Sequence, residues 1–131
     1  MTRFAYICRN GRCVLRADGH ADFCPGSDIV CAGASALMCA LAGALDTLSA
    51  QGVQRTLSAG HAAIAADDRT DVRAAFTVAV TGLRQLAEAY PGHVAEDTDR
   101  APAQEEPNGS AAAGRCPGAV PGSGQQRKKE T

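Results

Sequence analysis

The most restrictive feature of the sequence is an Asn-Gly pair at residues 10 and 11, set between two stretches of alternating side chains. Residues 4–8 and 13–17 each place an apolar residue at every second position. Asn-Gly accepts the positive φ angles of a type I′ turn, so the pattern predicts a hairpin with a two-residue loop. This register makes Cys8 face Cys13 with Cα atoms about 4.5 Å apart. The geometry permits a disulfide there, but in a reducing cytoplasm we expect two packed thiols.

A helical pattern begins after residue 28. Asp28 is suited to the N-cap position, and Gly52 lies where we expect the C-terminal cap. Between them, apolar residues recur at intervals of three and four, which predicts one buried helix face. The residues of this face are Val30, Ala34, Leu37, Leu41, Leu45 and Leu48.

The next segment repeats the order of hairpin and helix. Residues 53–58 and 61–66, separated by Ala-Gly, predict a second hairpin. Acidic residues at 67, 68 and 71 favour the positive end of a second helix, which Pro-Gly at 91 and 92 ends. The buried residues predicted for this helix are Val72, Phe76, Val80, Leu83, Ala87 and Tyr90. The order ββαββα predicts a small α+β domain with an antiparallel sheet and both helices on one face. A homodimer is one way to cover the other face.

Composition limits the size of the domain and its partners. The chain has 131 residues, which argues for one domain. Residues 96–131 contain no Phe, Tyr, Leu, Ile or Met, so we expect a folded domain over 1–95 and a disordered Pro/Gly/Ala-rich tail over 96–131. Thirteen Lys and Arg against 14 Asp and Glu give no basic excess that would favour nucleic acid.

The sequence also contains no clear membrane or export signal. The apolar stretch 29–45 is shorter than the roughly 20 residues that span a bilayer. Residues 1–7 lack the apolar run of a signal peptide. We therefore expect a soluble, cytoplasmic protein.

Two residues on either side of a loop carry most of the chemical information. His20 ends the second predicted strand, and Cys31 is the third residue of the first predicted helix. Unpaired amides and the dipole at a helix start favour a thiolate, and a nearby imidazole can take the thiol proton. The same amides would stabilise an oxyanion. Residues 21–27 would form a loop beside the thiol that closes over an extended peptide.

Two other interpretations remain open. In the first, His20 is a strand-end residue and Cys31 is a small buried residue of an apolar helix. The second is a zinc site, although its C-x4-C and C-x6-C spacings match no common zinc motif. The zinc ligands would come from Cys8, Cys13, Cys24, Cys31 and His20.

Several neighbouring residues are candidates for supporting roles. Ser35 lies one helical turn beyond the predicted nucleophile, on the same face. Asp28 is expected to cap the helix, and either it or Asp22 could orient the imidazole. His61 and His93 have no nearby partner in the sequence and are interpreted as surface or strand-end residues.

Gly-His-Ala at residues 19–21 and Asp-Ile-Val-Cys-Ala-Gly-Ala-Ser-Ala-Leu at residues 28–37 closely resemble the ribosomal-processing cysteine protease family Prp. The order of elements across residues 3–91 is also similar to that family. The resemblance implies a homodimeric cysteine protease that removes an N-terminal extension from large-subunit ribosomal protein twenty-seven. It implies that His20 and Cys31 form the catalytic dyad. The implied chemistry needs no metal or organic cofactor. From the charge balance and the short apolar stretch we also expect no direct contact with nucleic acid and none with a membrane.

The resemblance further assigns substrate binding to the loop between the two dyad residues. Here the loop is more compact than the glycine-rich loop of the family. Its residues are Ala21, Asp22, Phe23, Cys24, Pro25, Gly26 and Ser27. The alternative from another class is a non-catalytic, ribosome-associated module in which this loop grips a peptide and the thiol is incidental.

Overall fold

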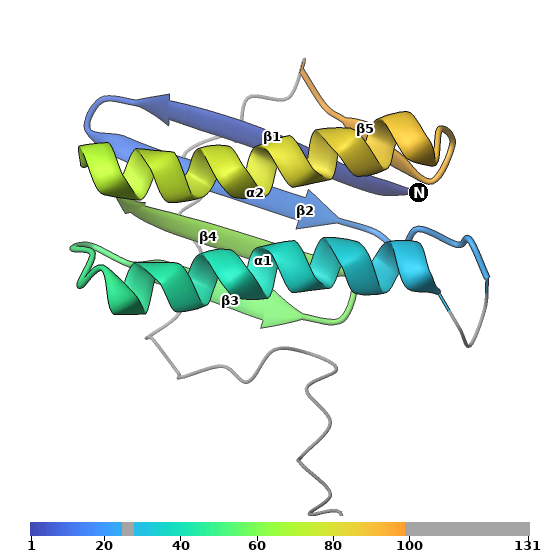
Figure 1. The fold of residues 1–131 in the computed structure, drawn as a ribbon, viewed down its shortest axis with the longest axis horizontal. Helices are drawn as coiled ribbons and strands as arrows, with labels where there is room; N and C mark the ends of the chain where they lie inside the picture. Colours follow the sequence, from blue (N-terminus) through green and yellow to red (C-terminus); the bar gives the residue numbers. More distant parts are fainter. Residues whose placement is uncertain (25–27, 99–131) are drawn as a thin grey trace, which may run out of the picture.

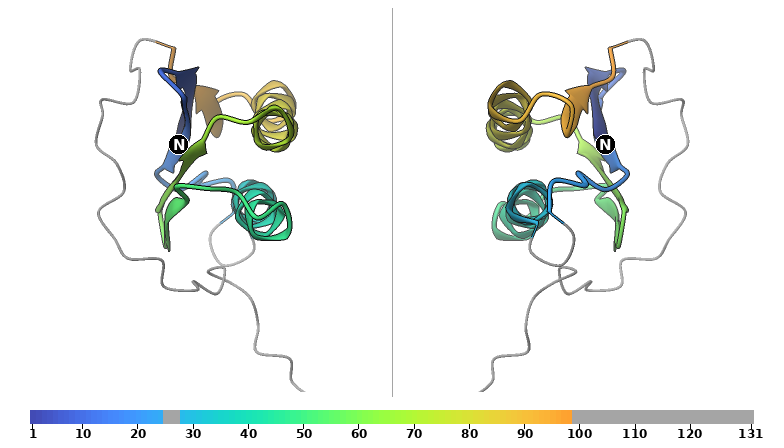
Figure 2. Two further views of the ribbon diagram at one scale, coloured as in Figure 1. Left: turned by 90° about the vertical axis from the view of Figure 1, so that its left-hand side faces the viewer. Right: turned by 90° about the vertical axis from the view of Figure 1, so that its right-hand side faces the viewer.

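The computed structural model describes residues 1–24 and 28–98. This part of the chain forms two layers, a five-stranded sheet and a pair of helices that both cover one face of it (Figures 1 and 2). The small α+β domain predicted from the sequence is confirmed. Its elements are β1 (Thr2–Arg9), β2 (Arg12–Asp18), α1 (Ile29–Thr47), β3 (Gln54–Ser58), β4 (His61–Asp67), α2 (Thr70–Ala89) and β5 (Val94–Glu96).

The β1–β2 hairpin has the predicted turn and register. Asn10 and Gly11 adopt φ angles of 54° and 77°, as a type I′ turn requires. Cys8 faces Cys13 with their Cα atoms 4.1 Å apart. The two sulfurs form a disulfide, so the expectation of two packed thiols is wrong, and the register of the hairpin is what brings them together.

The strand order is β3-β4-β2-β1-β5, and the last strand departs from the expected antiparallel sheet. β5 pairs in parallel with β1, so the sheet is mixed. Its backbone contacts begin before the strand itself, where the Thr2 N–H donates to the His93 carbonyl at 2.9 Å. Only three residues long, β5 has too little alternation to be detected as a strand from the sequence.

β5 also includes Glu96, the residue at which the sequence predicts the tail to begin. Its carboxylate accepts two hydrogen bonds from Arg84 of α2, at 2.8 and 2.9 Å. The next residue continues the pairing, since the Asp97 N–H donates to the Phe4 carbonyl at 2.7 Å. The predicted tail from residue 99 onward lies outside the described residues.

α1 ends earlier than predicted. Its last helical residue is Thr47, and the chain turns through Ser49 at a φ of 51°. Gly52, expected as the cap, instead leaves space for an ion pair. A Cβ there would lie 2.6 Å from Nη1 of Arg12 and 2.5 Å from Oδ1 of Asp67.

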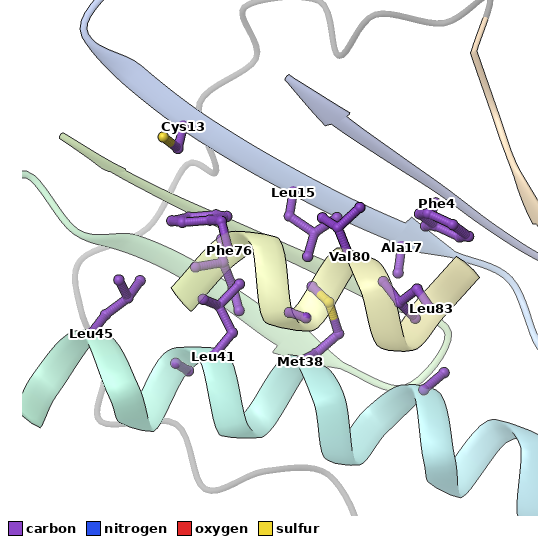
Figure 3. Packing of buried hydrophobic residues seen from close by; sticks show 14 of the residues in the cluster. Phe4, Cys13, Leu15, Ala17, Met38, Leu41, Leu45, Phe76, Val80 and Leu83 are labelled. Carbon is purple, nitrogen blue, oxygen red and sulfur yellow. The ribbon is translucent and has the colours of Figure 1, made fainter. Parts of the chain in front are cut away.

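The core lies between the sheet and the two helices (Figure 3). Leu37, predicted to be buried, is half-buried and packs against Gly82 of α2, while Met38 takes the core position. Among the described residues, α1 alone is long and apolar enough to cross a bilayer, judged by length and composition. The apolar stretch 29–45 predicted a segment too short for this, but the helix extends to Thr47. Its buried residues are Val30, Ala34, Met38, Leu41, Ala42 and Leu45, and those of α2 are Val72, Phe76, Ala79, Val80 and Leu83.

Candidate active site

A groove opens at the end of the sheet where β2 and the β3–β4 hairpin meet α1. Its volume is about 450 Å³ when counted out to the surrounding solvent. Cys31 and Ser35 line it from α1, as their spacing on one helix face predicts. Apolar side chains make up most of the rest of its wall, among them Ala17, Ala34, Met38, Leu57 and Ala62.

Cys31 occupies the predicted position at the start of α1. Asp28 is the N-cap, and its Oδ1 accepts the Cys31 N–H at 2.9 Å. Cys31 is therefore the third helical residue, a half-buried free thiol on the groove wall.

Asp28 does more than cap the helix. Its second oxygen, Oδ2, accepts the Phe23 N–H at 3.0 Å, so one carboxylate ties the loop to the helix start. These amides, first that of Cys31, hold the pKa of Asp28 below its usual value. The charged carboxylate beside the thiol opposes the positive end of the helix dipole.

The same contacts correct the expectation about the oxyanion. The Cys31 N–H is held by the Asp28 carboxylate, and the Ala32 N–H donates to the Asp28 carbonyl at 3.0 Å. These two amides are therefore engaged in the helix cap and the first helical turn. An oxyanion bound at the Cys31 N–H would require Asp28 to release it.

His20 lies just after β2 and is not one of the residues that line the groove, although it contacts one of them. The preceding residue, Gly19, donates its N–H to the Gly60 carbonyl at 2.8 Å. The imidazole packs against Gly60, where a Cβ would lie 2.7 Å from Nε2. Gly60 and Cys31 line the same groove, so the histidine contacts one wall of the groove that contains the thiol. Within residues 1–24 and 28–98, no hydrogen bond joins the His20 ring to the Cys31 thiol; such bonds often tighten only when substrate is bound.

The loop after His20 is anchored on the C-terminal end of α2. The Phe23 ring contacts Tyr90 and His93 edge to face, with centroids 5.2 and 5.3 Å apart. His93 Nδ1 donates to the carbonyl of buried Ala21 at 2.8 Å. His93 directly precedes β5, as a strand-end residue would, and its partner lies 72 residues away in the sequence. Predicted loop residues 25–27 lie outside the described residues.

Other candidate residues have partners away from the imidazole. Asp22 is exposed, and its carboxylate lies 3.5 Å from the N-terminal amine, so it does not orient His20 as the sequence suggested. His61 pairs with Asp18 across β4 and β2. Cys24 is an exposed free thiol in the loop.

The cysteines proposed as zinc ligands are not brought together. Cys8 and Cys13 lie beside the β1–β2 turn and form a disulfide, whereas Cys31 lies at the other end of the sheet. In the described part of the chain, the group of potential ligand atoms within reach of one ion is Cys8, Cys13 and Asp68. Asp68 is already paired with Arg73. This arrangement does not fit the zinc alternative.

Comparison with known proteins agrees with this geometry. Residues 1–95 match the family model described as "Cysteine protease Prp". The ribosomal processing protease Prp of S. aureus, crystallised with a covalently linked product peptide, is 25% identical with a TM-score of 0.66, and the match covers 74% of this chain and 98% of that one. A crystallised protein of Streptococcus mutans is 28% identical with a TM-score of 0.59, covering 74% and 92%.

A second structure of the S. aureus protease, with a substrate peptide, is 22% identical with a TM-score of 0.58 and supports the fold alone; the match covers 74% of this chain and 98% of that one. No curated protein matches the chain. Because the family model spans most of the sequence and the groove carries the expected cysteine, this chain belongs to the Prp family of cysteine proteases.

Proposed function

We propose that this cysteine protease removes the N-terminal extension of large-subunit ribosomal protein twenty-seven during ribosome assembly, with Cys31 as nucleophile and His20 as general base. The observation that carries the proposal is the placement of Cys31 and Gly60 on one groove, with the His20 ring packed on Gly60. The product peptide bound covalently to the S. aureus homologue supports a covalent mechanism.

The reaction follows from these two side chains. His20 takes the thiol proton, and the Cys31 sulfur attacks the scissile carbonyl carbon. The imidazolium then gives its proton to the leaving amine, and a thioester forms as the C–N bond breaks. Water, deprotonated by His20, hydrolyses the thioester and releases the new carboxyl end. A general base contributes about 10²- to 10⁴-fold to such a reaction. No metal or organic cofactor takes part.

The groove indicates what part of a peptide would lie beside the thiol. Met38 and Leu57 line it from α1 and β3, and small residues of α1 and β2 complete an apolar wall. An extended peptide would place one apolar side chain there. The loop of residues 21–27 would cover the peptide, with Phe23 42% exposed on the part anchored to α2.

The assembly and location of the enzyme complete the proposal. We expect a cytoplasmic homodimer with no direct contact with nucleic acid or a membrane. Both helices lie on one face of the sheet, which leaves the other face as one surface for a second subunit (Figure 2). Sedimentation equilibrium of the full chain would give the mass of the assembly, and a monomer at micromolar concentration would contradict this part of the proposal.

The decisive experiment is incubation of the purified enzyme with full-length ribosomal protein twenty-seven from the same organism, followed by intact mass of the products. Wild-type protein should remove a defined N-terminal segment. Cys31→Ala should remove none, and His20→Ala should be slower by about 10²- to 10⁴-fold. Val78→Ala is the control, because it shortens an exposed side chain of α2 that does not line the groove and should cleave normally.

Two outcomes would contradict the proposal. Equal cleavage by Cys31→Ala and wild type would exclude this thiol as the nucleophile. Binding of the extension without cleavage by any variant would favour the non-catalytic peptide-binding module. Alkylation gives an independent test, since an activated Cys31 should react near neutral pH faster than a thiol with a pKa of about 8.5.

A further inference from the structure

Two hairpin turns of the sheet contain a glycine with nearly the same backbone conformation. Gly11, in the β1–β2 turn, has a φ of 77°, and Gly60, in the β3–β4 turn, has a φ of 72°. Both angles lie in the region where a side chain is disfavoured for steric reasons. The backbone alone therefore explains a glycine equally well at both positions.

The surroundings of these glycines are different. A Cβ added at Gly11 would meet no heavy atom within 4 Å. At Gly60 the same Cβ would lie 2.7 Å from Nε2, 3.2 Å from Cε1 and 3.4 Å from Cδ2 of His20. The imidazole thus occupies the space that a side chain at position 60 would need.

Gly60 also holds the backbone from which His20 projects. Its carbonyl accepts the Gly19 N–H at 2.8 Å, one residue before the histidine. The turn itself is fixed by the Ser58 hydroxyl, which donates to the His61 carbonyl at 3.1 Å, and by the His61–Asp18 pair. One residue therefore limits both the main chain and the ring of His20.

We propose that Gly60 is a positioning residue for the imidazole of His20. It lines the groove that contains Cys31, so a ring resting on its Cα is held at the edge of that groove. A side chain at position 60 would displace the ring, because the atoms in its way belong to a rotatable side chain and not to the backbone. The inference rests on the proposed role of His20 as general base.

The experiment compares Gly60→Ala with Gly11→Ala in the full chain. Both variants place a methyl group at a positive φ, and only Gly60→Ala meets the imidazole. Thermal midpoints should fall by similar amounts. Gly60→Ala should lower kcat by about tenfold or more with a smaller change in KM, as expected for a misplaced catalytic group. Gly11→Ala should keep the wild-type kcat.

A second measurement separates positioning from stability. The alkylation rate of Cys31, followed by peptide mass spectrometry between pH 5 and 9, should lose in Gly60→Ala the same low-pH reactivity that it loses in His20→Ala. The other titratable groups around this end of the sheet include Asp18, Asp22, Cys24, Asp28, His61, Tyr90, His93 and the N-terminal amine, and neither glycine variant replaces them.

Each outcome has one meaning. A Gly60→Ala enzyme that keeps the kcat and alkylation profile of Gly11→Ala overturns the positioning role alone. A His20→Ala enzyme with an unchanged alkylation profile overturns the proposed dyad and this inference with it. If Gly60→Ala does not fold, the wild-type protein still provides a test, since a nuclear Overhauser effect between the His20 ring and the Gly60 Hα protons is required.

Discussion

The two ends of strand β2, which lies between β4 and β1, differ in the contacts around them (Figure 1). Near Arg12, covalent and ionic contacts join neighbouring elements. The Cys8–Cys13 disulfide crosses the hairpin, and Arg12 donates to Asp67 at 2.9 Å and to the Gly52 carbonyl at 2.6 Å. Near Asp18, the groove lies open beside Cys31. The structure thus separates the contacts that hold the strands from the residues that carry the chemistry.

We call the Arg12 end of β2 the closed end and the Asp18 end, beside the groove, the open end. The N-terminus of α2 adds contacts to the closed end. The Asp68 N–H donates to the Gly11 carbonyl at 2.9 Å, which ties the β1–β2 turn to the helix start. Arg73 pairs with the Asp68 carboxylate and lowers its pKa, and Arg69 does the same for Asp71. The two carboxylates also interact favourably with the positive, N-terminal end of the α2 dipole.

At the open end, polar contacts position a loop and a helix start. Asp28 joins the Phe23 amide to that of Cys31, and His93 holds the Ala21 carbonyl. These contacts hold Ala21, Phe23 and the start of α1 in place. Substitutions there should affect turnover more than global stability, and the reverse should hold at the closed end.

The largest expected effect is the loss of activity in Cys31→Ala. Removal of a nucleophile lowers kcat by at least about 10⁴-fold. The free energy of unfolding should stay close to that of wild type, because the thiol is half-buried on a groove wall. Cleavage assays and urea unfolding on the same preparation would test the pair of results. A large loss of stability would show that the open end also supports the fold.

A cysteine-to-alanine substitution at the closed end should lower stability and leave activity nearly unchanged. Cys13→Ala removes the disulfide and a fully buried sulfur, so unfolding should become easier by about 2–4 kcal/mol. Reduction of the wild-type bond should account for much of this change. The kcat/KM for the substrate should remain within about twofold, because the disulfide lies at the opposite end of the sheet from the groove and distant sites usually act independently. An activity loss comparable to that of Cys31→Ala would contradict the separation of the two ends.

The sequence predicts the parts of both ends that depend on local interactions. The Asn-Gly turn determines the Cys8–Cys13 register within the hairpin, and the Asp28 cap acts over three residues, so both were accessible from spacing alone. The strand and helix order follows from periodicity for the same reason.

Contacts between distant segments were not accessible. His93 and Ala21 are 72 residues apart, and their hydrogen bond exists because β5 returns the chain beside β1. The packing of His20 on Gly60 likewise depends on the position of β4 beside β2. Gly52 was one signal of such a contact in the sequence. A glycine several residues past a helix end indicates either a cap or a place where other groups pack against the backbone, here Arg12 and Asp67.

His93 provides a smaller test of the open end. His93→Phe keeps a ring near Phe23 but loses the donor to the Ala21 carbonyl, which should lower kcat/KM by about 2- to 10-fold, the usual net value of one hydrogen bond. His93→Asn keeps a donor near the position of Nδ1 and should recover most of that loss. Steady-state kinetics with a peptide of the extension would measure both. A defect in His93→Asn with none in His93→Phe would assign the effect to the ring contact instead.

The smallest expected effect is the dependence of stability on acid pH. The folded-state pKa of Asp28, Asp68 and Glu96 lies below the ordinary values of 3.8, 3.8 and 4.5, through amides at Asp28 and arginines at the other two. The unfolded chain therefore binds more protons, so this stabilisation is complete above about pH 4.5 and is lost as the pH falls through the lowered values.

Urea unfolding between pH 2 and 7 would measure this loss and compare Asp28→Asn with Asp68→Asn. Each variant should show a shallower fall in stability below pH 4.5 than wild type, because one lowered carboxylate has been removed. Only Asp28→Asn should also change the rate of Cys31 alkylation at pH 7, because its carboxylate binds the backbone N–H of that cysteine. If Asp68→Asn changed that rate as much, the two ends of the sheet would be coupled through the helices, and the separation of stability from chemistry would not hold.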